Sequence, residues 1–256
     1  MTYHETVTSE KKKMCYWIYI NRPEKLNALD TRTTAKLIDE LKKGCSSDSI
    51  AIVLTGKGRS FSTGDDIENM LKLNSKEEAV NFFNGIKQTI NLIISCPKPV
   101  IALVNGLAVG RGAEILLAAD IVIAAENSWF SYPEISLGVI PSVLISNGPH
   151  VFGFRRSKYL AITGTRFSAQ DAKLMGLVDE VVPQSDLEKE AINITDILSN
   201  YPPESIKAIK ETITKLYWKD IEYAIDQLTN LVITKEAKNR MKSFEFHKLR
   251  PIRNSH

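Results

Sequence analysis

Two carboxylates lie beside a glycine-rich turn in the middle of this 256-residue chain. Glu114 follows a turn that contains Gly106, Gly110 and Gly112, and Glu134 comes twenty positions later. Glycines before a helix start let backbone N–H groups approach a ligand closely. Such N–H groups can stabilise a developing oxyanion, while two carboxylates move protons. An ordinary β-turn-α unit with two solvated acids fits this stretch equally well, since spacing alone does not show that the groups converge.

The elements around the turn follow from its apolar pattern. We expect a strand over Val100–Val104, a helix over about Ala113–Ala119 and a second strand over Ile121–Ala124. This order would place Glu114 just inside the helix and Glu134 after the second strand.

The rest of the chain alternates strand and helix patterns. We predict a hairpin formed by Tyr3–Ser9 and Met14–Ile20 with lysines at its tip. The stretch Ile135–Pro149 is loop-like at first and then shows no clear pattern, so no helix is predicted there. The remaining predicted strands are Ile50–Thr55 and Val178–Val182. The remaining predicted helices, with caps at Asp30, Ser75, Ser168 and Ser185, are Arg32–Lys43, Ser75–Ile94, Ser168–Met175 and Ser185–Ser199.

A boundary is predicted at Pro202-Pro203, because helical spacing continues throughout the sequence after Glu204. The expected division is a mixed α/β core over residues 1–200 and a helical region over residues 201–256.

Composition excludes several classes of protein. The net charge of +3 is too small to indicate nucleic acid or a membrane surface as a partner. The three cysteines (Cys15, Cys45 and Cys96) are widely spaced, so neither a disulfide framework nor a zinc site is indicated. The four histidines show no ligand spacing, and no metal is predicted. No apolar run reaches about 18 residues and no signal peptide is recognisable, so we expect a cytoplasmic protein outside the membrane.

Five segments in order resemble the enoyl-CoA hydratase/isomerase (crotonase) family over nearly the whole chain. They are NRPEKLNAL (Asn21–Leu29), IVLTGKGRSFSTGDDI (Ile52–Ile67), KPVIALVNGLAVGRGAEILLAADIVIAAE (Lys98–Glu126), FSYPEISLGVIP (Phe130–Pro141) and ITGTRFSAQDAKLMGLVDEVVP (Ile162–Pro183). A dinucleotide site is set aside, because Gly110-Arg111-Gly112 lacks the third glycine and the downstream ribose acid.

The resemblance implies an α/β fold, the crotonase (ClpP-like) spiral of ββα units, with a C-terminal helical trimerisation region. It implies a homotrimer or a hexamer that is a dimer of trimers. It also implies an acyl-CoA thioester as ligand, with no cofactor because CoA is part of the substrate.

The resemblance also assigns site residues. The backbone N–H groups of Asp65 and Arg111 would form an oxyanion hole, Glu114 would activate water, and Glu134 would protonate Cα. The substrate- and CoA-binding positions by the same matching are Lys25, Leu26, Ala28, Gly64, Asp65, Asp66, Ile67, Glu68, Gly110 and Arg111. Lys248 and Arg250 could reach a CoA phosphate, but simple surface charge is the favoured interpretation.

Two departures from the family pattern matter. The family carries a small residue at the position of Asp65 and glycine at that of Arg111. We expect Asp65 and Arg111 to form an ion pair, with Glu114 as the competing partner and an outward-pointing arginine as the alternative. A left-handed conformation at Arg111 would add strain. The second departure is Ser142–Ser146, where bulky side chains replace a glycine-rich segment and are expected to narrow the acyl pocket or move Glu134.

These observations favour an enoyl-CoA hydratase (a hydro-lyase) that adds water to a 2-enoyl-CoA, the reaction class of fatty-acid β-oxidation. The alternatives within the family are an enoyl-CoA isomerase and a hydroxyacyl-CoA hydrolase. From a different class, a catalytically weak protein that sequesters acyl-CoA or binds RNA through its lysines stays open.

Overall fold

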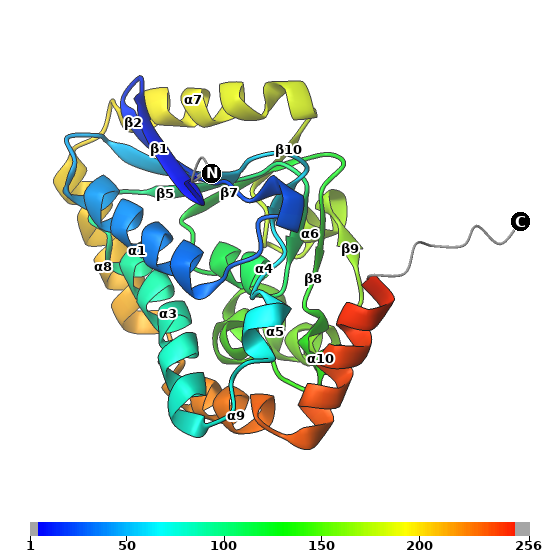
Figure 1. The fold of residues 1–256 in the computed structure, drawn as a ribbon. Coiled ribbons are helices and arrows are strands. Elements are labelled where there is room, and N and C mark those ends of the chain that lie inside the picture. Colours follow the sequence, from blue (N-terminus) through cyan, green and yellow to red (C-terminus); the bar gives the residue numbers. More distant parts are fainter. Residues whose placement is uncertain (1–4, 249–256) are drawn as a thin grey trace, which may run out of the picture.

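A computed structural model of the protein describes residues 5–248, with side chains through residue 246. The larger sheet has six strands in the order β1-β2-β3-β5-β7-β10, and only the β1–β2 pair within it is antiparallel. Figure 1 shows these strands crossing the upper part of the molecule. Their bounds are β1 (Val7–Lys12), β2 (Cys15–Ile20), β3 (Ala51–Gly56), β5 (Val100–Val104), β7 (Ile121–Ala125) and β10 (Glu180–Val182).

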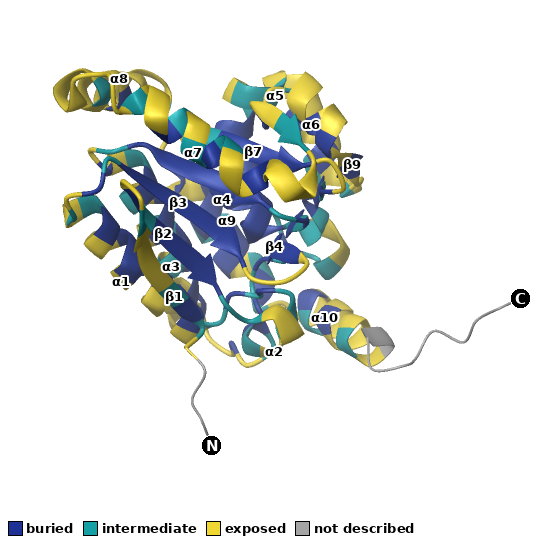
Figure 2. Cartoon of the chain, turned by 90° about the horizontal axis from the view of Figure 1, so that it is seen from above, coloured by how far each residue is buried: buried dark blue, intermediate teal, exposed yellow. Residues whose placement is uncertain are grey.

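Both faces of this sheet are covered, as parallel sheets require. Along β3, Ile52 and Leu54 belong to the main core, whereas Ala51 and Val53 face a second, smaller apolar cluster. The smaller cluster is closed by α7 (Leu187–Leu198) through Leu187 and Ala191. On the other face lie α1 (Thr31–Ser46) and α3 (Lys76–Ser95). Figure 2 shows the inner strands β2, β3 and β7 buried, whereas β1 at the edge of the sheet is largely exposed.

A second, smaller sheet is formed mainly by the strands that follow β3, β5 and β7 along the chain. Its order is β4-β6-β8-β9, with β4, β6 and β8 parallel and β9 antiparallel to β8. Each turn of the chain therefore contributes one strand to each sheet and then a helical segment, in the sequences β3-β4-α2-α3, β5-β6-α4 and β7-β8-η2-α5. The bounds are β4 (Ser60–Ser62), β6 (Leu107–Val109), β8 (Trp129–Ser131), β9 (Phe167–Ser168), α2 (Ile67–Met70), α4 (Arg111–Leu116), η2 (Pro133–Leu137) and α5 (Ser142–Thr163).

The chain after residue 202 is helical and packs against the core. Its helices are α8 (Pro203–Tyr217), α9 (Glu222–Val232) and α10 (Lys235–Lys248). Helix α8 contacts α3, α9 contacts α3 and α5, and α10 contacts η2 and α2. Figure 1 shows α10 at the side of the molecule that carries β8 and β9. The short elements that complete the chain are η1 (Pro23–Lys25), α6 (Ala169–Leu174) and η3 (Gln184–Asp186).

Several predicted elements are confirmed. The strand over Val100–Val104 has the predicted bounds. The Asp30 carboxylate accepts a hydrogen bond from Thr33 N at the start of α1, and Ser75 with Glu78 forms the predicted capping box of α3.

Three predictions of secondary structure are wrong. The region Ile135–Pro149, for which no helix is predicted, contains the start of the long helix α5, which holds Pro149 and bends at Gly153, where φ is +74°. The hairpin strand extends through Lys12, so its lysines do not all lie at the tip. Helix α7 starts at Leu187 and has no side-chain cap, so Ser185 does not open it.

The cysteines also differ from expectation, because Cys45 and Cys96 form a disulfide. Cys45 lies in the last turn of α1 and Cys96 caps the end of α3, and the packing of these two helices brings the two Cα atoms to 5.5 Å. A separation of 51 residues in the sequence hides this proximity. Among residues 5–248, no helix is long and apolar enough to span a bilayer.

Candidate active site

Three turns that follow adjacent strands of the smaller sheet build the candidate site. The turn after β4 carries Gly64 and Asp65, the turn after β6 carries Gly110 and Arg111, and the turn after β8 carries Glu134. Because β4, β6 and β8 are parallel neighbours, their carboxyl ends meet at one edge. The fold thus brings together residues that are up to 70 positions apart in the sequence.

A cavity of about 640 Å³ opens at this edge, a size typical of small-molecule sites. Both Glu114 and Glu134 lie on its wall. Eight of the ten predicted binding residues also line it, namely Lys25, Leu26, Ala28, Asp65, Asp66, Ile67, Gly110 and Arg111. Gly64 lies behind the wall, and Glu68 lies outside it, where its carboxylate accepts a hydrogen bond of 2.5 Å from Lys25.

The Asn21–Leu29 segment holds one wall in place. Asn27, at φ 59° and fully buried, donates to the carbonyls of Lys57 and Ser60. Arg22 lies 3.2 Å from the Asp66 carboxylate and donates to the carbonyl of Ala28. These contacts fix the loop that carries the lining positions 25, 26 and 28.

The backbone N–H groups of Asp65 and Arg111 have no hydrogen-bond partner among the described residues. The two turns touch, since a Cβ atom built on Gly64 would lie 2.9 Å from the Arg111 nitrogen. Gly64 has φ +84°, so glycine is favoured there for its conformation as well as for space. Arg111 is the first residue of α4 and has a right-handed backbone conformation, whereas the residue with positive φ is Gly110. The strain considered for Arg111 is therefore absent.

The predicted ion pair between Asp65 and Arg111 is confirmed. Arg111 is 2% exposed, and its Nη1 lies 3.0 Å from Asp65 Oδ1. The alternatives are wrong, because the guanidinium does not point outward and Glu114 binds other partners. Burial raises the pKa of the Asp65 carboxyl, and the charge of Arg111 opposes this rise.

Glu114 is held by a helix start. Its Oε1 accepts hydrogen bonds from the N–H groups of Val143 (2.6 Å) and Leu144 (3.1 Å), in the first turn of α5. These donors and the helix dipole favour the charged carboxylate. Burial opposes them and dominates, so the pKa of Glu114 is raised to about 7.

Glu134 lies in a less polar setting. Its Oε2 is buried and has no hydrogen-bond partner among the described residues. Its Oε1 lies against Gly110, where a Cβ atom would approach to 3.0 Å. Burial, and then the charge of Glu114, raise the pKa of Glu134 well above its ordinary value. A buried carboxyl oxygen without a partner at a cavity wall is suited to meet a ligand or water.

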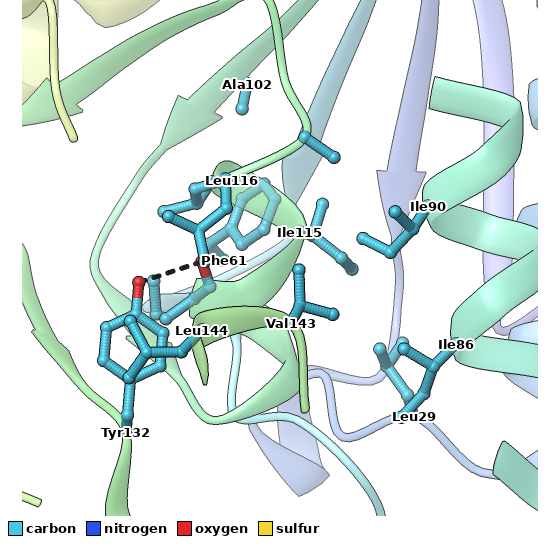
Figure 3. Packing of buried hydrophobic residues seen from close by; sticks show 14 of the residues in the cluster. Leu29, Phe61, Ile86, Ile90, Ala102, Ile115, Leu116, Tyr132, Val143 and Leu144 are labelled. Carbon is cyan, nitrogen blue, oxygen red and sulfur yellow. Dashed lines mark hydrogen bonds between the residues drawn. The ribbon is translucent and has the colours of Figure 1, made fainter. Parts of the chain in front are cut away.

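The expectation that the Ser142–Ser146 side chains narrow the acyl pocket is wrong, because none of them lines the cavity. Their expected effect on the position of Glu134 stays a prediction. Val143 and Leu144 are fully buried in the main core, and Ile145 is exposed. Figure 3 shows Val143 and Leu144 among Leu116, Phe61 and Tyr132 of that core. The segment therefore contributes to the site through the backbone N–H groups that donate to Glu114, and not through the bulk of its side chains.

Sequence reasoning missed two groups of lining residues. The apolar end of the cavity is formed by Met70, Phe83, Ile86, Val139, Ile140, Leu228 and Phe244. Phe83 and Ile86 were visible as an apolar stripe on α3, which predicts burial but does not distinguish core from cavity wall. The wall also contains Arg59, Trp129 and Arg166, and the Arg166 guanidinium lies 4.2 Å from the Trp129 ring centroid. No pattern in the sequence links these three residues.

The described side chains contain no cluster of three or more potential metal ligands. The side chains of Lys248 and Arg250 lie outside the described residues. A second cavity of about 800 Å³ lies beneath α8, but its carboxylate, Asp120, is paired with the buried ammonium of Lys210. The concentration of acids beside unpartnered N–H groups singles out the first cavity.

Comparisons with known proteins point to one family. A family model described as enoyl-CoA hydratase/isomerase matches residues 10–246. A short-chain-enoyl-CoA hydratase of Clostridium acetobutylicum is 33% identical over 247 residues, which cover 93% of this chain and 94% of that protein. Enoyl-CoA delta isomerase 2 of Homo sapiens is also 33% identical, over 202 residues that cover 77% of this chain and 51% of that protein.

A solved structure confirms the predicted crotonase fold with its C-terminal helices. An enoyl-CoA hydratase from Bacillus halodurans superimposes with a TM-score of 0.87 at 24% identity, covering 93% of this chain and 100% of that one. With the family model matching most of its length, this chain belongs to the enoyl-CoA hydratase/isomerase family.

Proposed function

We propose that this protein is an enoyl-CoA hydratase, which adds water across the double bond of a 2-enoyl-CoA thioester. The observation that carries the proposal is that Glu114 and Glu134 share one cavity beside two backbone N–H groups without partners. A reaction that only moves a double bond needs one proton-transferring group at a time, whereas hydration needs a base for water and an acid for Cα.

In the proposed reaction, the thioester carbonyl accepts hydrogen bonds from the N–H groups of Asp65 and Arg111. Glu114 takes a proton from water as its oxygen bonds to Cβ, and the π electrons move to the carbonyl oxygen. The enolate then collapses as Glu134 gives a proton to Cα. Proton exchange between the two carboxyls, or with solvent, restores the starting state. Each N–H donor would contribute about 10²–10³ in rate if it acts as oxyanion-hole donors do elsewhere.

The electrostatics support this division of roles. Burial and the charge of Glu114 raise the pKa of Glu134 well above its ordinary value, which favours its protonated form, as an acid requires. The pKa of Glu114, about 7, leaves a substantial fraction ionised, as a base requires. All protons in this scheme come from the two carboxyls and water, so we propose no metal or redox cofactor.

The cavity wall supports a place for each part of the substrate. We assign the acyl chain to the apolar end near Phe83, Ile86 and Leu228. We assign CoA to the wall formed by Lys25, Leu26, Ala28, Asp66 and Ile67, which continues from the oxyanion turn. Glu68 and Gly64 would act behind this wall, by holding Lys25 and by allowing the turns to touch.

We also propose that the protein assembles as a homotrimer or a dimer of trimers, with the helices after residue 200 as the assembly region of a core formed by residues 1–200. Large apolar side chains are exposed on these helices of the monomer, including Leu216 (63%) and Tyr223 (79%), as surfaces covered in an assembly would be. A monomeric mass in light scattering would contradict this proposal.

An isomerase is the second candidate, because the human isomerase is as similar in sequence as the bacterial hydratase. Conversion of crotonyl-CoA to 3-hydroxybutyryl-CoA and conversion of 3-enoyl to 2-enoyl-CoA separate the two. We expect wild-type hydration, and a loss of at least about 10²-fold in kcat for both Glu114→Gln and Glu134→Gln.

The matched control is Glu126→Gln, which changes an exposed glutamate in the loop after β7 and should leave kcat unchanged. Isomerisation that survives Glu114→Gln and is lost only with Glu134→Gln, without hydration by the wild type, would establish the isomerase. Hydrolysis of a 3-hydroxyacyl-CoA in place of either reaction would establish the hydrolase. Thioester binding without any of these reactions would leave only a binding role.

A further inference from the structure

The Arg111 side chain is held by three separate parts of the chain. Its Nη1 donates to Asp65 Oδ1 (3.0 Å) and to Thr34 Oγ1 (3.2 Å), and its Nη2 donates to Thr89 Oγ1 (3.2 Å). Thr34 lies on α1, Thr89 on α3 and Asp65 on the turn after β4. We call the side chains of Asp65, Thr34 and Thr89 the arginine cradle.

The two helices of the cradle are in direct contact. A Cβ atom built on Gly85 of α3 would lie 2.6 Å from Thr34 Cγ2, so glycine at this position permits the close approach. The Thr89 hydroxyl donates to the Gly85 carbonyl at 2.7 Å, which leaves its oxygen free to accept from Arg111. Thr89 is fully buried and Thr34 is 6% exposed, so water does not compete for these hydrogen bonds.

The ion pair within this arrangement joins Asp65 and Arg111, the two residues whose backbone N–H groups are the proposed oxyanion donors. This ion pair restrains the distance between the peptide groups of Asp65 and Arg111. The hydrogen bonds from Arg111 to Thr34 on α1 and Thr89 on α3 hold the guanidinium in place. The ion pair is also neutral as a whole, since Arg111 balances the charge that Asp65 would otherwise place beside a developing oxyanion. Preorganised donors stabilise a transition state without a cost of reorientation at the moment of reaction.

We propose that Arg111, Asp65, Thr34 and Thr89 are positioning residues that hold the two backbone N–H donors at the spacing that binds an enolate oxygen. This proposal rests on the proposed function of the cavity. The two threonines act through the guanidinium and touch no substrate, since neither lines the cavity.

Thr34→Val and Thr89→Val, alone and together, remove hydroxyls with little change of side-chain volume and no change of charge. In the double variant we expect kcat for hydration to fall about tenfold and KM to change less than about threefold, because misplaced donors lose mostly transition-state binding. The matched control is Thr195→Val, another buried threonine, on α7 beyond the large sheet, which should keep both constants.

A second readout does not depend on turnover. A saturated acyl-CoA labelled with ¹³C at the thioester carbonyl should show a downfield shift on binding to the wild type, caused by the two donors. The double variant should lose part of that shift and the Thr195→Val control should keep it. If the wild type shifts the carbonyl but converts no enoyl thioester, the proposed reaction is wrong while the cradle stands. If the double variant keeps both the carbonyl shift and kcat and only its melting temperature falls, the cradle is structural and the proposal is overturned.

Discussion

Glu114 and Glu134 share a cavity but differ in what surrounds each carboxyl. Glu114 accepts two backbone hydrogen bonds from the start of α5, whereas Glu134 leaves one buried oxygen without a partner. Burial raises both pKa values, and at Glu114 the two N–H donors offset part of the rise, which leaves its pKa at about 7. Two identical side chains are therefore placed in different electrostatic environments, the arrangement by which one site can hold an acid and a base.

The largest expected effect comes from pushing Glu134 out of place. In Gly110→Ala, the new Cβ would lie 3.0 Å from Glu134 Oε1, at a position where φ is +55°. We expect kcat to fall by up to about 10²-fold, because Glu134 must move by a few tenths of an ångström and small misplacements of a reacting group are costly. Stability should also fall by about 1 kcal/mol or more from the backbone strain. Steady-state kinetics and chemical denaturation measure the two effects.

Gly153→Ala is the matched control, since Gly153 also has positive φ (+74°) but an added Cβ would meet nothing within 4 Å. It should lose stability and keep kcat. Equal losses of kcat in both variants would show that backbone strain, and not contact with Glu134, causes the effect.

A smaller effect is expected in the pH dependence of stability. Glu114 has a higher pKa folded, about 7, than its ordinary 4.5, so the folded state holds its proton more tightly. Its favourable contribution is present below about pH 4.5 and is lost as pH rises through about 7, by about 3 kcal/mol. Glu114→Gln cannot ionise, so the unfolding free energy of wild type relative to this variant should fall by about that amount between pH 4.5 and 8. Burial and the charge of Glu114 also raise the pKa of Glu134, so the unfolding free energy of wild type relative to Glu134→Gln should fall in the same direction as pH rises above about 4.5. An unfolding free energy that does not fall with pH relative to either variant would contradict the raised pKa values.

Much of the fold followed from local sequence. The Val100–Val104 strand was predicted with its bounds because a β-branched run between proline and a glycine turn has no other good conformation. Helix α5 was missed because Pro149 and Gly153 interrupt its pattern and it presents no single apolar stripe. The strands of the smaller sheet have two or three residues each, too few to show a period.

For the site, the sequence showed which residue types are present, but not most of the groups that form hydrogen bonds with them. The ion pair between Asp65 and Arg111 could be predicted because their backbone groups were assigned to one oxygen. The donors to Glu114 could not, because Val143 and Leu144 act through peptide N–H groups that every residue type except proline carries. The disulfide between Cys45 and Cys96 depends on how α1 and α3 pack, which is a tertiary property.

Exchange of Cα protons with deuterated solvent tests the division of roles most directly. The group that delivers a proton to Cα must also remove one, so a saturated acyl-CoA bound in the site should incorporate deuterium through Glu134 alone. We predict incorporation by the wild type and by Glu114→Gln, although hydration by the latter is at least about 10²-fold slower, and none by Glu134→Gln. Loss of exchange in Glu114→Gln with exchange retained in Glu134→Gln would contradict the account.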